Sequence, residues 1–123
     1  MTLKDVLDLV DESKHNTASR KLKCYWLNQI ENEIYDEVIA THEGGDQILR
    51  PDIREDSPDD TEMLIPDKYA EVYVYWLGAK IDYQLHEYAR FNNSNAMYEA
   101  EYAKYRSWYN REHMPKQPTP VWF

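Results

Sequence analysis

The chain of 123 residues has one cysteine, three glycines and two phenylalanines, and it lacks any run of about 18 apolar residues. The single cysteine, Cys24, cannot form an internal disulfide, and residues 1–10 lack the basic start and apolar run of a secretion signal. The scarcity of glycine excludes collagen-like and low-complexity chains. We therefore expect one folded domain without a membrane span, made in a reducing cytoplasm.

Positive charge is also scarce, because 14 Lys and Arg stand against 23 Asp and Glu, for a formal net charge of −9. Residues 1–43 carry a net charge of −4, residues 44–66 carry −5, and residues 67–123 are neutral. So few cations exclude an extended face that binds nucleic acid through its phosphates. The middle segment contains two glycines and three prolines, which predicts a long solvated loop with a short strand at residues 63–65.

Apolar residues at helical spacing predict an all-α fold, a small bundle of three to four helices. Thr2 and Asp5 can cap a short first helix that ends before Ser13. A second helix is predicted over about residues 19–41, where apolar side chains recur four apart until Gly44 and Gly45 follow.

A third helix is predicted after Pro66, with Asp67 as its N-cap. Its first half is apolar nearly all round, which demands burial on every side. The run Asn92–Asn95 favours a turn before a fourth helix, although the aromatic spacing continues through it unshifted, as in one continuous helix.

Tyrosine dominates the aromatic residues, with 11 Tyr and 4 Trp beside 2 Phe. Stripes of such rings on helices form either core or interface, since each ring has an apolar body and a polar atom. A domain of this size buries only about two-thirds of its unfolded surface, so we expect neighbouring subunits or a large partner to cover part of the stripes. The candidate inter-subunit residues are Tyr69, Tyr73, Trp76, Tyr83, Tyr98, Tyr102, Tyr105, Trp108 and Tyr109.

Residue patterns that carry chemistry are few. Asp82 and His86 share a helix face, which is either half of a carboxylate-histidine metal site or a surface pair, and the second half of such a site is absent. The acids of residues 56–62 fail the EF-hand pattern, and Cys24 has no neighbour in sequence that would activate its thiol. We predict no metal, no cofactor and no catalytic residue, and hence no enzyme.

Residues 1–113 are expected to form one helical domain, and residues 114–123 an extended arm, because its three prolines deny it a helix. The arm is either frayed or inserted into a groove of a partner. For the second alternative the candidate docking residues are Pro118, Pro120, Val121, Trp122 and Phe123.

Seven segments follow one another in a specific order and spacing of helical faces: Lys23–Ile30, Met63–Tyr69, Val72–Tyr73, Ala79–Tyr83, Glu87–Asn93, Ala96–Tyr98 with Tyr102, and Trp108–Pro115. Together they cover roughly two-thirds of the chain, and they resemble the small helical head-tail connector (adaptor or head completion) proteins of tailed phages and prophages of Gram-positive bacteria. The middle loop of this chain is longer and more acidic than expected for that family.

The resemblance implies a structural virion protein at the head-tail interface, assembled in the host cytoplasm. Such a protein joins the portal, usually as a twelvefold homo-oligomeric ring, passes DNA without binding it specifically, and presents a surface for the next connector, stopper or tail protein. Two features agree: an all-round apolar helix suits a closed ring of heterologous contacts, and acidic character suits a channel through which DNA slides. The acidic loop would face either the lumen or the tail side.

An alternative function comes from the charge alone. A small acidic protein can imitate DNA and inhibit a host DNA-binding protein. Mimicry requires carboxylates spread over an organised surface, whereas the acids here concentrate in the predicted loop of residues 44–66 and the last 57 residues are neutral.

Overall fold

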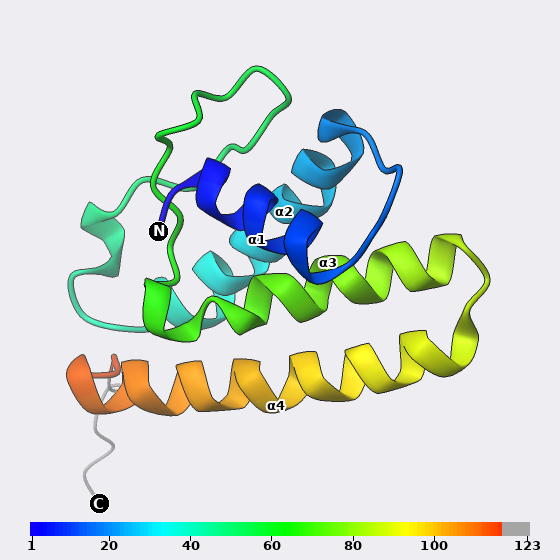
Figure 1. Cartoon of the computed structure of the whole chain (residues 1–123). Helices are drawn as coiled ribbons and strands as arrows, with labels where there is room; N and C mark the ends of the chain where they lie inside the picture. Colours follow the sequence, from blue (N-terminus) through cyan, green and yellow to red (C-terminus); the bar gives the residue numbers. More distant parts are fainter. Residues whose placement is uncertain (117–123) are drawn as a thin grey trace, which may run out of the picture.

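The computed structural model describes residues 1–116, and every regular element in this range is a helix (Figure 1). The α-helices are α1 (Leu3–Ser13), α2 (Arg20–Ile34), α3 (Glu71–Gln84) and α4 (Tyr88–Glu112). α3 contacts the other three, with α4 antiparallel along one side and α1 and α2 on the other. The predicted all-α bundle is confirmed. No described helix is long and apolar enough to cross a bilayer.

α1 begins where the sequence predicts. The Thr2 hydroxyl accepts a hydrogen bond from the backbone N–H of Asp5 (3.2 Å), and the Asp5 carboxylate accepts one from the backbone N–H of Thr2 (3.1 Å). This reciprocal cap satisfies two amides that the helix itself leaves unpaired. The apolar face of α1 lies in the core through Leu3, Val6, Leu7 and Val10.

α2 also begins as predicted, with Ser19 as its N-cap, but it does not run as one α-helix to residue 41. It ends at Ile34, and the chain continues as a π-helical turn over Tyr35–Ile39, in which the backbone N–H of Ala40 donates to the carbonyl of Tyr35 (2.8 Å). The wider turn keeps the side chains of Val38 and Ile39 buried in the core.

The middle segment, residues 44–66, is the predicted loop, with one 3₁₀ turn at Gly45–Gln47. The Arg20 guanidinium holds the loop onto the start of α2 by donating to the carbonyls of Glu55 and Ser57, at 2.9 Å each. These hydrogen bonds satisfy loop carbonyls that no helix or sheet pairs, and they fix the acidic loop against the bundle.

The short strand expected at residues 63–65 is wrong. Next to this segment lies an isolated antiparallel bridge between Thr2 and Glu62, and the backbone N–H of Met63 donates to the carbonyl of Met1 (2.9 Å). The pairing cannot extend, because the partner segment turns into α1 at Leu3.

The predicted start of the third helix is corrected as well. Asp67 does not cap α3: it lies in a 3₁₀ turn (Asp67–Tyr69), and α3 begins at Glu71 without a side-chain cap. The Asp67 carboxylate lies instead 3.1 Å from the Met1 ammonium. The tight turn is closed by the Ala70 backbone N–H, which donates to the carbonyl of Asp67.

The predicted turn at Asn92–Asn95 is wrong, because these residues lie inside α4. The chain reverses earlier, over residues 85–87, where His86 adopts a left-handed backbone with φ of 59°. Ser94 explains why the polar run stays helical, since its hydroxyl donates to the Asp82 carboxylate of α3 (3.0 Å). A contact between helices thus outweighs the local preference of asparagine for turns.

The two left-handed positions give a paired prediction on stability. His86→Gly is expected to raise the free energy of unfolding by up to about 1 kcal/mol, because a side chain at positive φ costs about 1–2 kcal/mol. Gly44→Ala, at φ of 82°, is expected to lower it by about 1 kcal/mol, since no atom lies within 4 Å of the added Cβ and only backbone strain acts. Urea unfolding measures both. A loss of stability in His86→Gly would mean that the hydrogen bond between His86 Nδ1 and the Tyr88 hydroxyl (2.9 Å) outweighs the strain.

Candidate functional site

The aromatic stripe proposed for contacts between subunits lies largely inside this chain, where its rings on α3 and α4 also contact Glu31 of α2 and residues 37 and 42. Ring centroids of Tyr98 and Tyr102 are 5.8 Å apart, and those of Tyr105 and Tyr109 are 6.0 Å apart. Five of the nine residues are buried there, and they need no second subunit to cover them. They are Tyr73, Tyr98, Tyr102, Tyr105 and Tyr109.

The other four residues of the stripe retain accessible surface. Tyr69, Trp76 and Trp108 are half-buried, while Tyr83 is 58 % exposed. The Trp76 indole is hydrogen-bonded within the bundle, since its N–H donates to the carbonyl of Trp26 (2.9 Å). Among these four, Tyr83 therefore offers the largest surface to a partner.

One tyrosine also links α4 to the π-helical turn. The Tyr102 hydroxyl donates to the Glu37 carboxylate at 2.8 Å. Burial raises the pKa of Tyr102, and this hydrogen bond raises it further, so the phenol keeps its proton throughout the neutral range.

Glu31 is a carboxylate buried at the centre of the bundle, 1 % exposed, and no lysine, arginine or histidine of residues 1–116 pairs with it. Its Oε2 accepts a hydrogen bond from the backbone N–H of Leu64 (2.9 Å), and its Oε1 accepts one from the buried Tyr73 hydroxyl. That hydroxyl in turn accepts a bond from the backbone N–H of Ile65 (3.0 Å). The network ties α2, α3 and the end of the acidic loop together.

Burial controls the charge of Glu31. Desolvation raises its pKa from 4.5 to about 7, against the smaller lowering by the Tyr73 and Leu64 hydrogen bonds. Burial likewise raises the pKa of Tyr73 well above its usual value, so the Tyr73 hydroxyl acts as the donor in this pair. The carboxyl therefore changes its protonation near neutral pH, inside the core.

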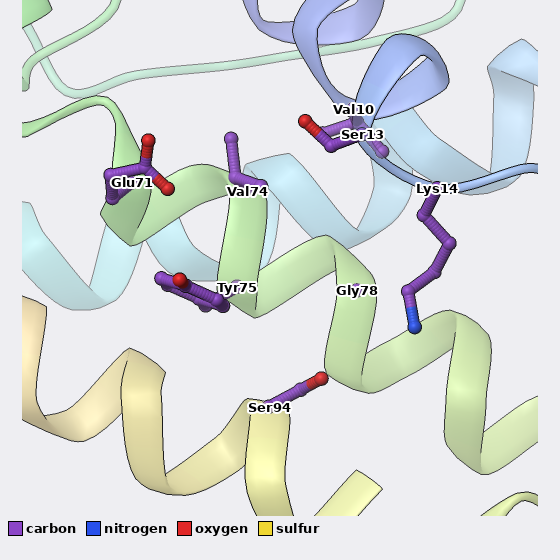
Figure 2. A pocket seen from close by; sticks show the side chains of 8 residues that line it. All are labelled: Val10, Ser13, Lys14, Glu71, Val74, Tyr75, Gly78 and Ser94. Carbon is purple, nitrogen blue, oxygen red and sulfur yellow. The ribbon is translucent and has the colours of Figure 1, made fainter. Parts of the chain in front are cut away.

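A pocket of about 260 Å³ opens between the end of α1, α3 and α4 (Figure 2). Lys14 reaches from the end of α1, and its Nζ lies 2.5 Å from Asp82 Oδ1, while the Ser94 hydroxyl donates to Asp82 Oδ2. Asp82 is only 2 % exposed and both its oxygens are engaged. This cluster joins α3, α4 and the residue that follows α1, and the Lys14 stem passes beside Gly78, where an added Cβ would make ordinary van der Waals contact with Lys14 Cε at 3.6 Å.

Asp82 and His86, the pair that resembled half of a metal site, face different surroundings. Asp82 faces Lys14 and Ser94, whereas His86 lies beyond the end of α3, exposed, beside the Tyr88 hydroxyl. Among residues 1–116 no three His, Cys, Asp or Glu side chains gather as a metal site would require.

The acids of the loop are exposed, and two of them pair with arginines, one from the loop and one from α2. Arg54 Nε lies 3.1 Å from Asp52, and Arg20 lies 3.0 Å from Asp59. Arg50 reaches out of the loop to Asp36, at 2.5 Å. The loop surface is therefore a mixture of paired and free carboxylates.

Cys24 is completely buried on the inner face of α2. Burial raises the pKa of its thiol, which keeps the sulfur protonated and weakly nucleophilic. It packs in the core, as its neighbours Leu27 and Ile30 do.

The described part of the arm is fastened to the bundle. The backbone N–H of Glu43 donates to the carbonyl of Met114 (2.9 Å), and that of Lys116 donates to the carbonyl of Thr41 (2.8 Å). Beneath them the buried His42 lies 2.7 Å from Asn110 Oδ1, with its ring 4.7 Å from that of Tyr109. The candidate docking residues lie outside the described residues: Pro118, Pro120, Val121, Trp122 and Phe123.

Comparisons with protein-family models, with curated proteins and with solved structures find no match to this chain. The resemblance to head-tail connectors therefore remains a prediction from the sequence.

Three polar residues of the interior were missed by sequence reasoning: the buried Glu31 and His42, and the half-buried Lys14. Each lies where helical periodicity predicts an apolar or solvated side chain, and each finds its partners far along the chain. One signal was present, since Glu31 directly follows Ile30 on the apolar side of α2 and its i+3 neighbour Ile34 is apolar.

Proposed function

We propose that this chain is a structural, non-enzymatic virion protein: a head-tail connector or adaptor that forms a ring beneath the phage portal. The observation that carries the proposal is the anchored start of the arm. Residues 41–43 hold Met114 and Lys116 by two backbone hydrogen bonds, so the described start of the arm is fixed to the bundle. The sequence that follows ends in Val121, Trp122 and Phe123, and an apolar segment of this kind is suited to insert into a groove of a neighbouring protein.

The charge distribution supports a role around DNA without DNA binding. The protein carries a net charge of −9, and two loop arginines, Arg50 and Arg54, are paired with Asp36 and Asp52. A ring of such subunits repels phosphates, which lets a duplex slide through its lumen.

Quantification of the chain in purified particles tests the proposal. Mass spectrometry is expected to give a near-equal molar ratio to the portal protein in particles of the phage or prophage that encodes it. Absence from particles, together with abundance in the infected cell, would contradict a connector.

Deletion of residues 117–123 is expected to abolish binding to the portal while leaving the bundle folded, because the contacts of Met114 and Lys116 are kept. Co-sedimentation with portal rings measures binding, and circular dichroism measures folding. The matched control is Trp122→Ala with Phe123→Ala in the full-length chain, which removes the rings and keeps the length. Portal binding that survives both changes would overturn the role of the arm.

A DNA-mimicking inhibitor is the second candidate, favoured by one observation: the loop acids are exposed on one side of the bundle. Binding of this kind falls steeply with salt, because it depends on charge. Salt-sensitive capture of a basic host protein, combined with absence from particles, would favour the mimic.

A further inference from the structure

The end of the acidic loop is held to the core through the side chain of one buried acid. We call residues 62–65 the loop end. The Glu31 carboxylate accepts hydrogen bonds from the backbone N–H of Leu64 (2.9 Å) and from the Tyr73 hydroxyl. The Tyr73 hydroxyl in turn accepts the backbone N–H of Ile65 (3.0 Å). Two consecutive amides of the loop end are therefore paired by way of Glu31, instead of within a helix or a sheet.

The loop end is a single layer of chain over the Glu31 carboxyl. Glu62 is exposed and Leu64 is half-buried, whereas Met63 and Ile65 are buried. Outside the Glu31 network, the backbone N–H of Met63 donates to the carbonyl of residue 1 (2.9 Å). Because this layer is short and has solvent on its outer side, its separation from the bundle brings the carboxyl to water while the helices stay folded.

The charge of Glu31 is not balanced by a counter-ion. The titratable groups that face it are the hydroxyls of Tyr73 on α3 and Tyr105 on α4, and burial raises the pKa of both phenols, so they stay neutral. Within residues 1–116 the buried Tyr105 hydroxyl makes no hydrogen bond. The buried residues of α1 and of the π-helical turn are all apolar. An ionised Glu31 thus has two hydrogen bonds in place of full hydration.

We propose that Glu31 is a pH-sensitive latch on the loop end. The protonated carboxyl keeps the loop end closed on the bundle, and the ionised carboxylate favours an open state in which the loop end lifts and the carboxylate meets water. Burial of a charged carboxylate costs far more than burial of a neutral carboxyl. Opening removes this cost but exposes Met63 and Ile65, so the open state gains population as Glu31 loses its proton. The latch is a property of the single chain and goes beyond the connector function.

The pH range of the latch follows from burial. Desolvation raises the pKa of Glu31 from 4.5 to about 7 in the closed chain, whereas the open chain exposes the carboxyl to water. Between these two values the ratio of open to closed chains rises by nearly tenfold for each pH unit, and it levels off above about pH 7. The Met1 ammonium, which pairs with Glu62 and Asp67, stays charged in this range, because its hydrogen bond to Asp67 raises its pKa above 8.0.

Hydrogen exchange of backbone amides, followed by NMR on the full chain, tests the latch. Division of each observed rate by the intrinsic rate at the same pH gives the opening constant of each amide. The opening constants of Leu64 and Ile65 are expected to rise on the order of 50-fold between pH 5 and pH 8. Low concentrations of urea should leave these two amides unchanged and accelerate the slowest amides of α4, because only global unfolding exposes a large surface.

Two variants and one direct titration identify the group responsible. Glu31→Gln keeps the size of the side chain but cannot ionise, so the opening constants should stay within about twofold over the same pH range. Glu62→Gln removes an exposed carboxyl of the loop end itself and is the matched control, which should keep the pH dependence. The ¹³C signal of the Glu31 carboxyl follows its own protonation in the unaltered chain and is expected to shift near pH 7. Circular dichroism checks that each variant is folded.

Several results would overturn the latch. If Leu64 and Ile65 exchange only as slowly as the slowest amides of α4 at every pH, the loop end does not open on its own. If the opening constants are independent of pH, or if Glu31→Gln keeps the rise, Glu31 does not control the opening. A Glu31 carboxyl signal that titrates with that of Glu62 would also contradict it. None of these results bears on the connector function, which the composition of particles tests separately.

Discussion

The contribution of the Glu31 carboxyl to the free energy of unfolding is expected to be about 3 kcal/mol smaller above pH 7 than below pH 4.5. Burial raises the pKa of Glu31 from 4.5 to about 7 in the folded protein. Between these values the folded state holds a proton that the unfolded state has released. The contribution of Glu31 is therefore most favourable below pH 4.5, is lost as the pH rises to about 7, and stays constant above.

Glu31→Gln is the variant that isolates this effect. The free energy of unfolding is measured in urea from pH 4.5 to 8 for both chains, and their difference is expected to change by about 3 kcal/mol over that range. Glu12→Gln, which alters an exposed carboxyl of α1, is the control and is expected to leave the difference flat. A pH-independent difference in Glu31→Gln would show that the buried carboxylate is stabilised as fully as it is in water.

Lys14→Met is expected to lower the free energy of unfolding by about 3 kcal/mol at pH 7, because it leaves the Asp82 carboxylate buried without its cation. Methionine retains the apolar stem that packs over Gly78, so the loss reports the ammonium. Asp82→Asn should cost less, about 1 kcal/mol, since the Lys14 side chain, 28 % exposed, can turn to water.

Two further variants check the cause. Lys14→Met combined with Asp82→Asn is expected to recover most of the loss, because no unpaired buried charge remains. Lys4→Met breaks the exposed pair of Lys4 with Asp8 and should leave the free energy of unfolding nearly unchanged, because water screens both charges. Equal losses in Lys14→Met and Lys4→Met would refute the role of burial at Asp82.

Local signals in the sequence were sufficient for the beginning of the chain. Thr2 with Asp5 and Ser19 lie at helix starts as predicted, because a cap depends only on residues three apart. The acidic loop was also predictable, since proline, glycine and charge act locally. The helix caps and the acidic loop can both be predicted without knowing which distant residues they contact.

The predictions that failed depended on contacts between elements. The asparagine run stays helical because Ser94 is bonded to Asp82 across the α3–α4 seam, and the turn falls at His86, a residue type with only a modest preference for it. The tyrosine stripe was expected to need a second subunit in part, yet five of its rings are buried within this chain. Helical spacing identifies a face to be buried but does not name what buries it.

The surfaces of the candidate site were even harder to predict from the sequence, because segments far apart in the chain form them. The pocket between residues 48–53 and 61–64 forms only because these two segments fold back on one another, and Met63 of its lining donates a backbone hydrogen bond to Met1. The surface at residues 83–88 depends on the position of the turn between α3 and α4, which was predicted seven residues too late. Juxtapositions of this kind follow from the whole fold.

The central position of α3 has a consequence for protein synthesis. A ribosome makes α1, α2 and the whole acidic loop before it reaches Glu71, so the apolar faces of the first two helices lack α3 during that time. We expect a chain that ends before residue 71 to expose Leu3, Val6, Ile30 and Ile34 and to aggregate. The bundle can form only after nearly the entire chain has been translated, which makes its folding a late event in the life of each molecule.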